Sequence, residues 1–151
     1  MTFLLLPHFL FSNDYPEIES FFKNLSSLQN KRSFHELALT RTYPFKYEIS
    51  SVDDDVTNAV ILNDVNHYLT LAESNNTKTI DYAYSCNIRD ANLNEGVYAV
   101  ELVVSEEMAT TTQIYKIISH QIITLRKVDQ KLKMTSNRAT VVKDESKARK
   151  G

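Results

Sequence analysis

The chain has 151 residues, of which 42% are hydrophobic, and its 17 Lys and Arg against 19 Asp and Glu leave a formal net charge of -2. This length and composition suit one globular domain with its own hydrophobic core. Of the two glycines only Gly96 is internal, where average usage would give about ten. This scarcity excludes glycine-rich phosphate and dinucleotide loops and the G-x-S-x-G turn of serine hydrolases.

Residues 1–12 contain an apolar run from Phe3 to Phe11. The run is too short for a transmembrane helix, which needs about 20 apolar residues. It is typical either of a truncated export signal, with cleavage near Asn13, or of an apolar strand that packs on the domain. The first interpretation predicts an extracytoplasmic protein, periplasmic or secreted, and the second a cytoplasmic one.

A helix is predicted over about residues 15–29. Asp14 is a suitable N-cap, Pro16 suits the first turn, and Glu17 completes a capping box. The apolar residues that follow have the spacing of one buried helix face. They are Ile18, Phe21, Phe22, Leu25 and Leu28.

The next segment is less regular. Residues 31–42 permit a second short helix, and the alternation of residues 45–49 after Pro44 predicts a short strand. The acidic run 53–55 is interpreted as a turn or a helix N-cap. Residues 56–72 fit a β-hairpin that turns at 63–66, and a helix over the same residues is the alternative.

From residue 80 onward the chain is predicted to be mainly β-structure, because apolar and polar residues alternate. The expected strands are 80–88, 98–104, 110–125, 131–135 and 139–142, with a loop over 90–96 and a turn over 127–130. The charged residues 144–151 predict a disordered tail.

One helix followed by an antiparallel β-meander predicts an α+β fold in which the helix packs on a curved sheet. The expected domain organisation is a single domain over 13–143. This order of elements is similar to the cystatin-like and nuclear-transport-factor-2-like (NTF2-like) folds. The resemblance is one of element order and is not carried by any motif.

Tyrosines are the candidate ligand-binding residues. Tyr82, Tyr84, Tyr98 and Tyr115 are predicted to line the concave face of the sheet, where they would bind a small apolar ligand. The alternative is that these rings only form the core. Cys86 is the only cysteine, so no intrachain disulfide is possible, and its parity with Tyr84 predicts core packing.

No metal, cofactor or catalytic motif is recognisable. The four histidines are scattered, and an EF-hand starting at Asp53 would need glycine where Asn58 stands. If the protein is an enzyme, Asp81 and His120 are the candidate general bases, since they are polar residues within predicted strands. No cofactor is therefore expected.

Charge is distributed unevenly. Residues 126–151 carry nine of the 17 basic and three of the 19 acidic residues, a balance of +6 against -8 for the rest of the chain. This segment is a candidate contact for an acidic protein partner, or simply a solvated surface beside an acidic body. The candidate contact residues are Arg126, Lys127, Lys131, Lys133 and Arg138.

The leading functional prediction is a non-catalytic, extracytoplasmic binding or assembly domain, such as an envelope-complex subunit, an adhesin-like factor or an inhibitor. The alternative is a small pocket enzyme or ligand-binding protein with a tyrosine-lined cavity in the curved sheet. A third interpretation is an accessory protein whose basic tail touches nucleic acid, although no specific nucleic-acid binding and no transmembrane segment are expected.

Overall fold

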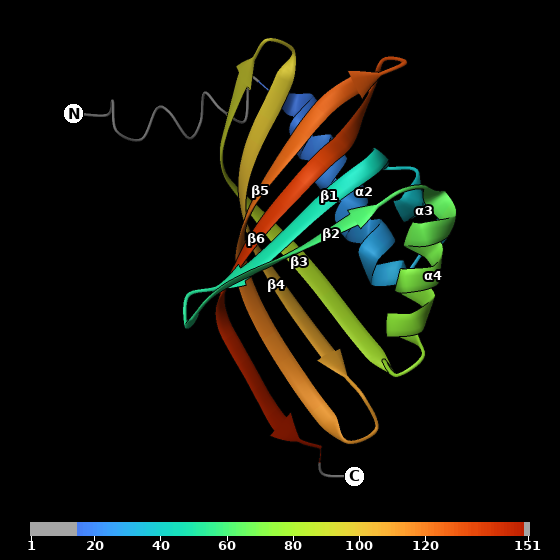
Figure 1. Ribbon diagram of the computed structural model, residues 1–151, viewed down its shortest axis with the longest axis vertical. Coiled ribbons are helices and arrows are strands. Elements are labelled where there is room, and N and C mark those ends of the chain that lie inside the picture. Colours follow the sequence, from blue (N-terminus) through green and yellow to red (C-terminus); the bar gives the residue numbers. More distant parts are fainter. Residues whose placement is uncertain (1–14, 150–151) are drawn as a thin grey trace, which may run out of the picture.

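The computed structural model describes residues 15–149, whose helices and strands are labelled in Figure 1. The two interpretations of residues 1–12 therefore concern residues outside this range. In chain order the elements are α2 (Pro16–Lys31), α3 (Phe34–Ala38), β1 (Arg41–Ser51), β2 (Asp54–Leu62), α4 (Val65–Asn76), β3 (Asp81–Asn94), β4 (Val97–Ala109), β5 (Gln113–Val128) and β6 (Lys131–Ala148).

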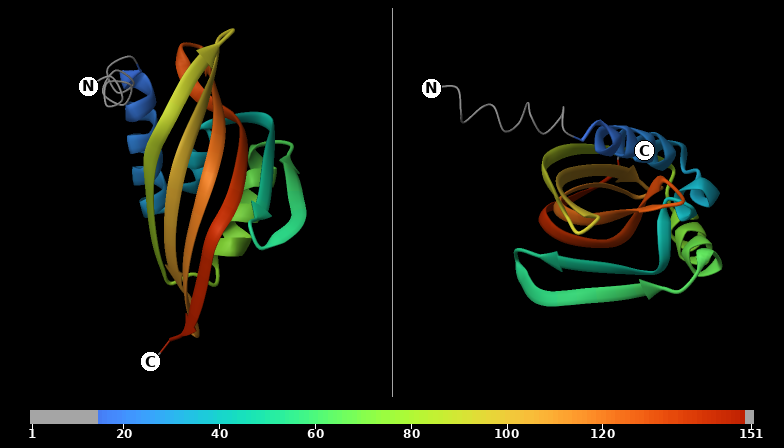
Figure 2. Two further views of the ribbon diagram at one scale, coloured as in Figure 1. Left: turned by 90° about the vertical axis from the view of Figure 1, so that its left-hand side faces the viewer. Right: turned by 90° about the horizontal axis from the view of Figure 1, so that it is seen from above.

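The strands form one six-stranded sheet in the order β2-β1-β6-β5-β4-β3. Neighbouring strands are antiparallel except for β1 and β6, which are parallel. Figure 2 shows that the sheet is strongly curved and that the helices lie on its concave side. The predicted α+β class, with a helix packed on a curved sheet in one domain, is confirmed.

Helix α2 forms where the apolar spacing predicts it. It begins at Pro16 with Tyr15 in the N-cap position, whereas the predicted cap, Asp14, lies outside the described residues. The helix ends at Lys31, and the left-handed φ of 54° at its C-cap, Arg32, turns the chain away. The buried face consists of Ile18, Phe22, Leu25 and Leu28.

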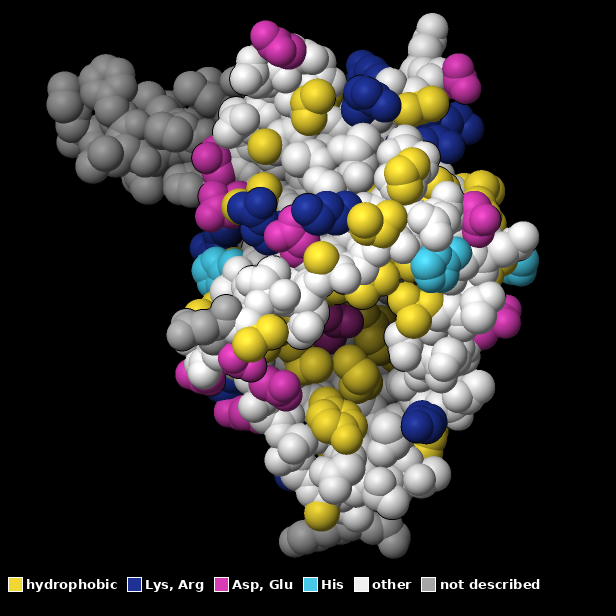
Figure 3. Space-filling view, in the orientation of Figure 1, with side chains coloured by type: hydrophobic (Ala, Val, Ile, Leu, Met, Phe, Trp, Pro, Cys, Tyr) yellow, Lys and Arg dark blue, Asp and Glu magenta, His cyan; other side chains and the backbone are white. Residues whose placement is uncertain are grey.

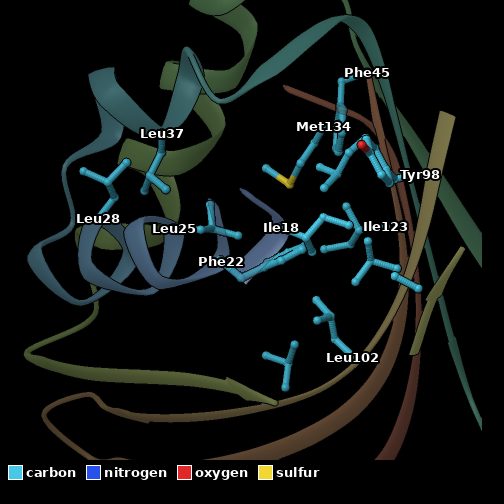
Figure 4. Close-up of a cluster of buried hydrophobic side chains, with 14 of the residues drawn as sticks. Ile18, Phe22, Leu25, Leu28, Leu37, Phe45, Tyr98, Leu102, Ile123 and Met134 are labelled. Atoms are coloured by element: carbon cyan, nitrogen blue, oxygen red, sulfur yellow. The ribbon is translucent and has the colours of Figure 1, made fainter. Parts of the chain in front are cut away.

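The core lies between α2 and the middle of the sheet. In Figure 4, Ile18 and Phe22 point from α2 toward Leu102 of β4 and Ile123 of β5, and all four are at most 2% exposed. Truncating a large buried side chain such as Phe22 to alanine costs about 3–5 kcal/mol. This packing holds α2 along β3 at one edge of the sheet.

The predicted hairpin over 56–72 is wrong. Residues 54–62 are a strand, but it pairs with β1, and the segment after it is helix α4. The reason is Asp64, whose side chain accepts a hydrogen bond of 2.8 Å from the backbone N–H of His67. Asp64 is thus a helix N-cap rather than a turn residue. Of the acidic run 53–55, only Asp53 lies in the turn between β1 and β2, together with Val52, because β2 begins at Asp54.

Another segment that was expected to be irregular is mostly a strand. The predicted loop 90–96 is wrong, because β3 runs to Asn94 with a register shift after Ile88, and only Glu95 and Gly96 form the turn. Both turn residues have positive φ, 52° and 80°, and glycine adopts this conformation without strain.

The C-terminal prediction also differs from the structure. Strand β6 continues to Ala148, so residues 144–148 of the predicted disordered tail are paired with the start of β5. The side chains of these residues are exposed, but their backbone forms hydrogen bonds with β5. Amino-acid composition does not reveal such backbone pairing. Within the described residues no helix is long and apolar enough to cross a membrane.

Candidate functional site

A cavity of about 650 Å³ lies between the concave face of the sheet and the helices. This is within the size range of small-molecule pockets. Figure 3 shows it as a hollow whose rim is mainly hydrophobic and at whose floor an acidic side chain lies. Most of its lining is apolar, and includes Phe34, Phe45, Leu62, Tyr68, Met108 and Ile123.

Glu106 is the acidic residue among the described residues that line the cavity. It lies on β4 at the position that continues the inward alternation of Val100, Leu102 and Val104, all fully buried. The hydroxyl of Tyr82, on the neighbouring strand β3, donates a hydrogen bond to Glu106 Oε2. A carboxylate is thereby held in a defined orientation within a mainly apolar cavity.

The tyrosines beside Glu106 remain protonated. Burial raises the pKa of Tyr82 far above its ordinary value, and the negative charge of Glu106 raises it further. Burial, followed by the same charge, raises the pKa of Tyr47 to about 12. The Tyr82 hydroxyl is therefore a permanent hydrogen-bond donor to the carboxylate at neutral pH.

Arg41, on β1, provides a positive charge in the same cavity. Its guanidinium carbon lies 4.4 Å from the ring centroid of Tyr68 and 4.9 Å from that of Phe45. Its Nε donates a hydrogen bond of 3.3 Å to the carbonyl of Leu37. Burial lowers the pKa of Arg41, yet arginine keeps its charge at neutral pH.

A polar wall crosses β5 and β6. The Asn137 amide donates to Gln121 Oε1 at 3.0 Å, and Gln121 Nε2 donates to Ser119 Oγ at 3.0 Å. Asn137 Oδ1 is buried and has no hydrogen-bond partner within residues 15–149. Because a buried acceptor without a partner is costly, this atom is a candidate contact for a donor group on a ligand.

The structure separates the four predicted tyrosines. Tyr82 and Tyr84 line the cavity, while Tyr98 and Tyr115 lie outside its lining. The Tyr98 hydroxyl donates to Glu17 Oε1 at 2.6 Å, a bond that raises its pKa to about 12. Tyr98 thus fastens α2 to β4.

The candidate general bases Asp81 and His120 do not lie in the cavity. Both side chains are exposed and neither lines the cavity. The physical reason is the two-residue period of a strand: Asp81 alternates with Tyr82, and His120 with Gln121, so each faces away from the concave side. The same period identifies Glu106, which the sequence interpretation missed.

Cys86 is half-buried and packs against the core beside Ile88, as its parity predicts. Its sulfur lies 3.4 Å from Ser26 Oγ, and burial raises the pKa of the thiol. No group of three or more His, Cys, Asp and Glu side chains in residues 15–149 is arranged to hold a metal ion.

The five basic residues predicted to contact a protein partner lie along β5 and β6, outside the cavity lining. Two of them pair with acidic residues of the domain: Lys127 with Glu17 at 3.1 Å and Arg138 with Glu48 at 3.7 Å. Such exposed pairs contribute little stability. Their role as a partner contact stays a prediction.

Solved structures with the same fold share little sequence with this chain. A proposed scytalone dehydratase from Novosphingobium aromaticivorans has a TM-score of 0.70 at 17% identity, covering 87% of this chain and 86% of its own. Hexachlorocyclohexane dehydrochlorinase LinA-type3 from Novosphingobium barchaimii has a TM-score of 0.69 at 12% identity, covering 89% and 90%. The type 2 form of this dehydrochlorinase has a TM-score of 0.68 at 14% identity, covering 92% and 90%.

No protein-family model matches the sequence, and no curated protein sequence matches it. The structural similarities show an NTF2-like fold, and the cavity lies on the concave side of its curved sheet. The prediction of a non-catalytic binding or assembly domain is therefore wrong. The cavity favours its alternative, a pocket enzyme or ligand-binding protein.

Proposed function

We propose that the chain is a pocket enzyme that binds a small, mainly apolar molecule and removes a proton from it with Glu106. The observation that carries this proposal is the carboxylate of Glu106 inside a cavity of about 650 Å³. A carboxylate that a hydrogen bond holds in position in a mainly apolar cavity can act as a general base toward a ligand bound beside it.

The lining supports the choice of ligand. Tyr82 and Tyr84 line the cavity together with aliphatic and aromatic side chains from the helices and the sheet. Such a lining suits a ligand with a ring or another compact apolar body. The Tyr82 hydroxyl occupies Oε2 of Glu106. Oε1 is then the oxygen left to accept a proton from a bound ligand.

The reaction class follows from the base. A carboxylate that removes a proton from carbon can start an elimination or an isomerisation. Elimination is also the reaction in the names of the similar structures, which are called dehydratase and dehydrochlorinase. At their low identity those names support only the choice of reaction to test.

The test measures proton removal directly. The ring ketones 1-tetralone and 2-indanone are incubated with the protein in D₂O, and loss of the C–H signal beside the carbonyl is followed by NMR. We expect the unaltered protein to accelerate exchange, and Glu106→Gln to slow it by about 10²–10⁴-fold, the usual contribution of a general base. Glu106→Gln is expected to keep binding the ketones, since the amide has nearly the shape of the carboxylate.

Glu107→Gln is the matched control, because Glu107 is the next residue of β4 but is 60% exposed on the other side and faces Lys116. This variant is expected to exchange like the unaltered protein. Equal exchange in Glu106→Gln and the unaltered protein would contradict the assignment of Glu106.

A second candidate function is ligand binding without turnover. The hydrogen bond from Tyr82 favours it, because it occupies one oxygen of Glu106 and holds the side chain as a fixed polar contact for a ligand. Binding of the ketones with no acceleration of exchange would identify this function.

A further inference from the structure

Arg41 is the feature of the cavity that general-base chemistry leaves unexplained. The ion pairs of residues 15–149 do not include it. A partly buried guanidinium without an opposite charge beside it is costly. Its charge is therefore available to a molecule that enters the cavity.

The contacts of Arg41 show which part of the guanidinium is available. Tyr68 and Phe45 lie within 5 Å of its carbon, and aromatic rings engage the flat face of a guanidinium. Nε donates to the carbonyl of Leu37. Among residues 15–149 no hydrogen bond uses its two terminal nitrogens, and their N–H groups match a carboxylate in two parallel hydrogen bonds.

The other cations of the lining do not offer the same site. The guanidinium of Arg32 already donates to Asn76 Oδ1 and to the carbonyls of Thr79 and Ile80, at 3.0–3.2 Å. Lys78 is exposed, so water solvates its charge. Of these three cations, Arg41 is the half-buried one whose two terminal nitrogens are not already used within residues 15–149.

We propose that the ligand carries a carboxylate and that Arg41 binds it. This inference rests on the proposed function. Glu106 repels an anion, so a ligand with one carboxylate is oriented with its charged end at Arg41 and its apolar body in the remainder of the cavity. The class of substrate is then a small aromatic or alicyclic carboxylic acid.

The test compares acids with their neutral amides. Dissociation constants at pH 7 are measured by calorimetry for benzoate, cinnamate and 2-naphthoate and for the three matching carboxamides. We expect each acid to bind at least about tenfold more tightly than its amide, the value of one charge-assisted hydrogen bond. Arg41→Gln is expected to abolish this preference, and Arg41→Lys to keep part of it.

Lys78→Gln is the matched control and is expected to leave the preference for acids unchanged. Loss of the preference in Lys78→Gln but not in Arg41→Gln would overturn the assignment. Equal binding of acids and amides to the unaltered protein would overturn this inference while leaving the proposed function standing. Binding of neither set would overturn both.

A further measurement needs no variant, and so does not depend on the folding of Arg41→Gln. The carboxyl resonance of ¹³C-labelled benzoate is titrated in the complex. A guanidinium partner lowers the pKa of the bound acid below that of free benzoate. An unchanged or raised pKa would contradict contact with Arg41.

Discussion

Glu106 and Glu107 are neighbours in β4 with opposite surroundings. Glu106 lines the cavity and accepts from Tyr82, whereas Glu107 is exposed and lies 3.8 Å from Lys116. The alternation of Tyr98 to Val104 predicts the inward face correctly, and Glu106 continues it. The sequence interpretation ended this strand at Val104 because polar residues follow, and so it missed the carboxylate.

The sequence identifies the other residues of the site only in part. Tyr82 and Tyr84 were predicted from parity and do line the cavity. Tyr98 has the same kind of parity, but its place along the strand brings it to α2 and Glu17 instead. Arg41 stands at the start of a strand, and only tertiary structure places Tyr68 of α4 against it.

Gln121 and Asn137 are predicted to be energetically coupled. Gln121→Met leaves the Asn137 amide without its acceptor, and Asn137→Leu leaves Gln121 Oε1 without its donor. Each single substitution is expected to cost about 1–3 kcal/mol, because a buried polar group loses its partner. The double variant is expected to cost less than the sum of the two, by about 1 kcal/mol or more.

Urea unfolding of the four proteins measures this coupling as the difference between the double variant and the two singles. Strict additivity would show that the Gln121–Asn137 hydrogen bond makes no net contribution. The presence of these polar residues in the cavity would then be explained only by contact with a ligand.

At the scale of elements, Glu17 connects α2 to the sheet. Its carboxylate accepts from the Tyr98 hydroxyl at 2.6 Å and lies 3.1 Å from Lys127 Nζ. The hydrogen bond from Tyr98, and then the one from Lys127, lowers the pKa of Glu17 below its ordinary value of 4.5. These contacts link the first turn of α2 to both β4 and β5.

The lowered pKa predicts a particular pH dependence. The unfolded chain protonates Glu17 at a higher pH than the folded chain does, so the stabilising contribution is present above pH 4.5 and is lost as the pH falls through the folded value. We expect the stability difference between the unaltered protein and Glu17→Gln to be constant near neutrality and to shrink below pH 4.5. Urea unfolding between pH 3 and pH 7 measures it.

Glu19→Gln is the control, since Glu19 lies in the same first turn of α2 and is exposed. The stability difference between Glu19→Gln and the unaltered protein should not shrink in the same way below pH 4.5. A difference for Glu17→Gln that stays constant down to pH 3 would contradict the role given to Tyr98 and Lys127.

The elements differ in how well the sequence predicts them. Helix α2 is found from its sequence because four of its residues bury one continuous face. Helix α4 buries no residue completely, and its apolar residues fit a hairpin as well as a helix, so Asn63 and Asp64 could be interpreted as a turn. The end of β6 is also not predicted from the sequence, because its charged side chains give no indication of the backbone pairing with β5.

At the scale of the whole molecule, one side of the cavity is formed by α4, the least anchored of the described helices. Five of the 12 residues of α4 line the cavity, and no side chain of α4 is fully buried. We expect the amides of α4 to exchange with deuterium faster than those of α2 in the free protein. A ligand such as 2-naphthoate is expected to slow exchange in α4 more than elsewhere.

Hydrogen exchange followed by mass spectrometry resolves the two helices as separate peptides. Equal protection of α4 and α2 in the free protein would contradict this prediction. So would ligand binding that protects the sheet and leaves α4 unchanged.

The parallel pairing of β1 with β6 also determines the order in which the fold can be completed. Strands β3 to β6 join through short turns and can assemble as they follow one another in the chain, whereas Ile49 of β1 pairs with Ala139 near the other end. Such distant pairing costs loop-closure entropy and slows folding. The hairpin of β1 and β2 can therefore join the sheet only once β6 is in place, so the part of the cavity that these two strands line is completed after the β3–β6 part.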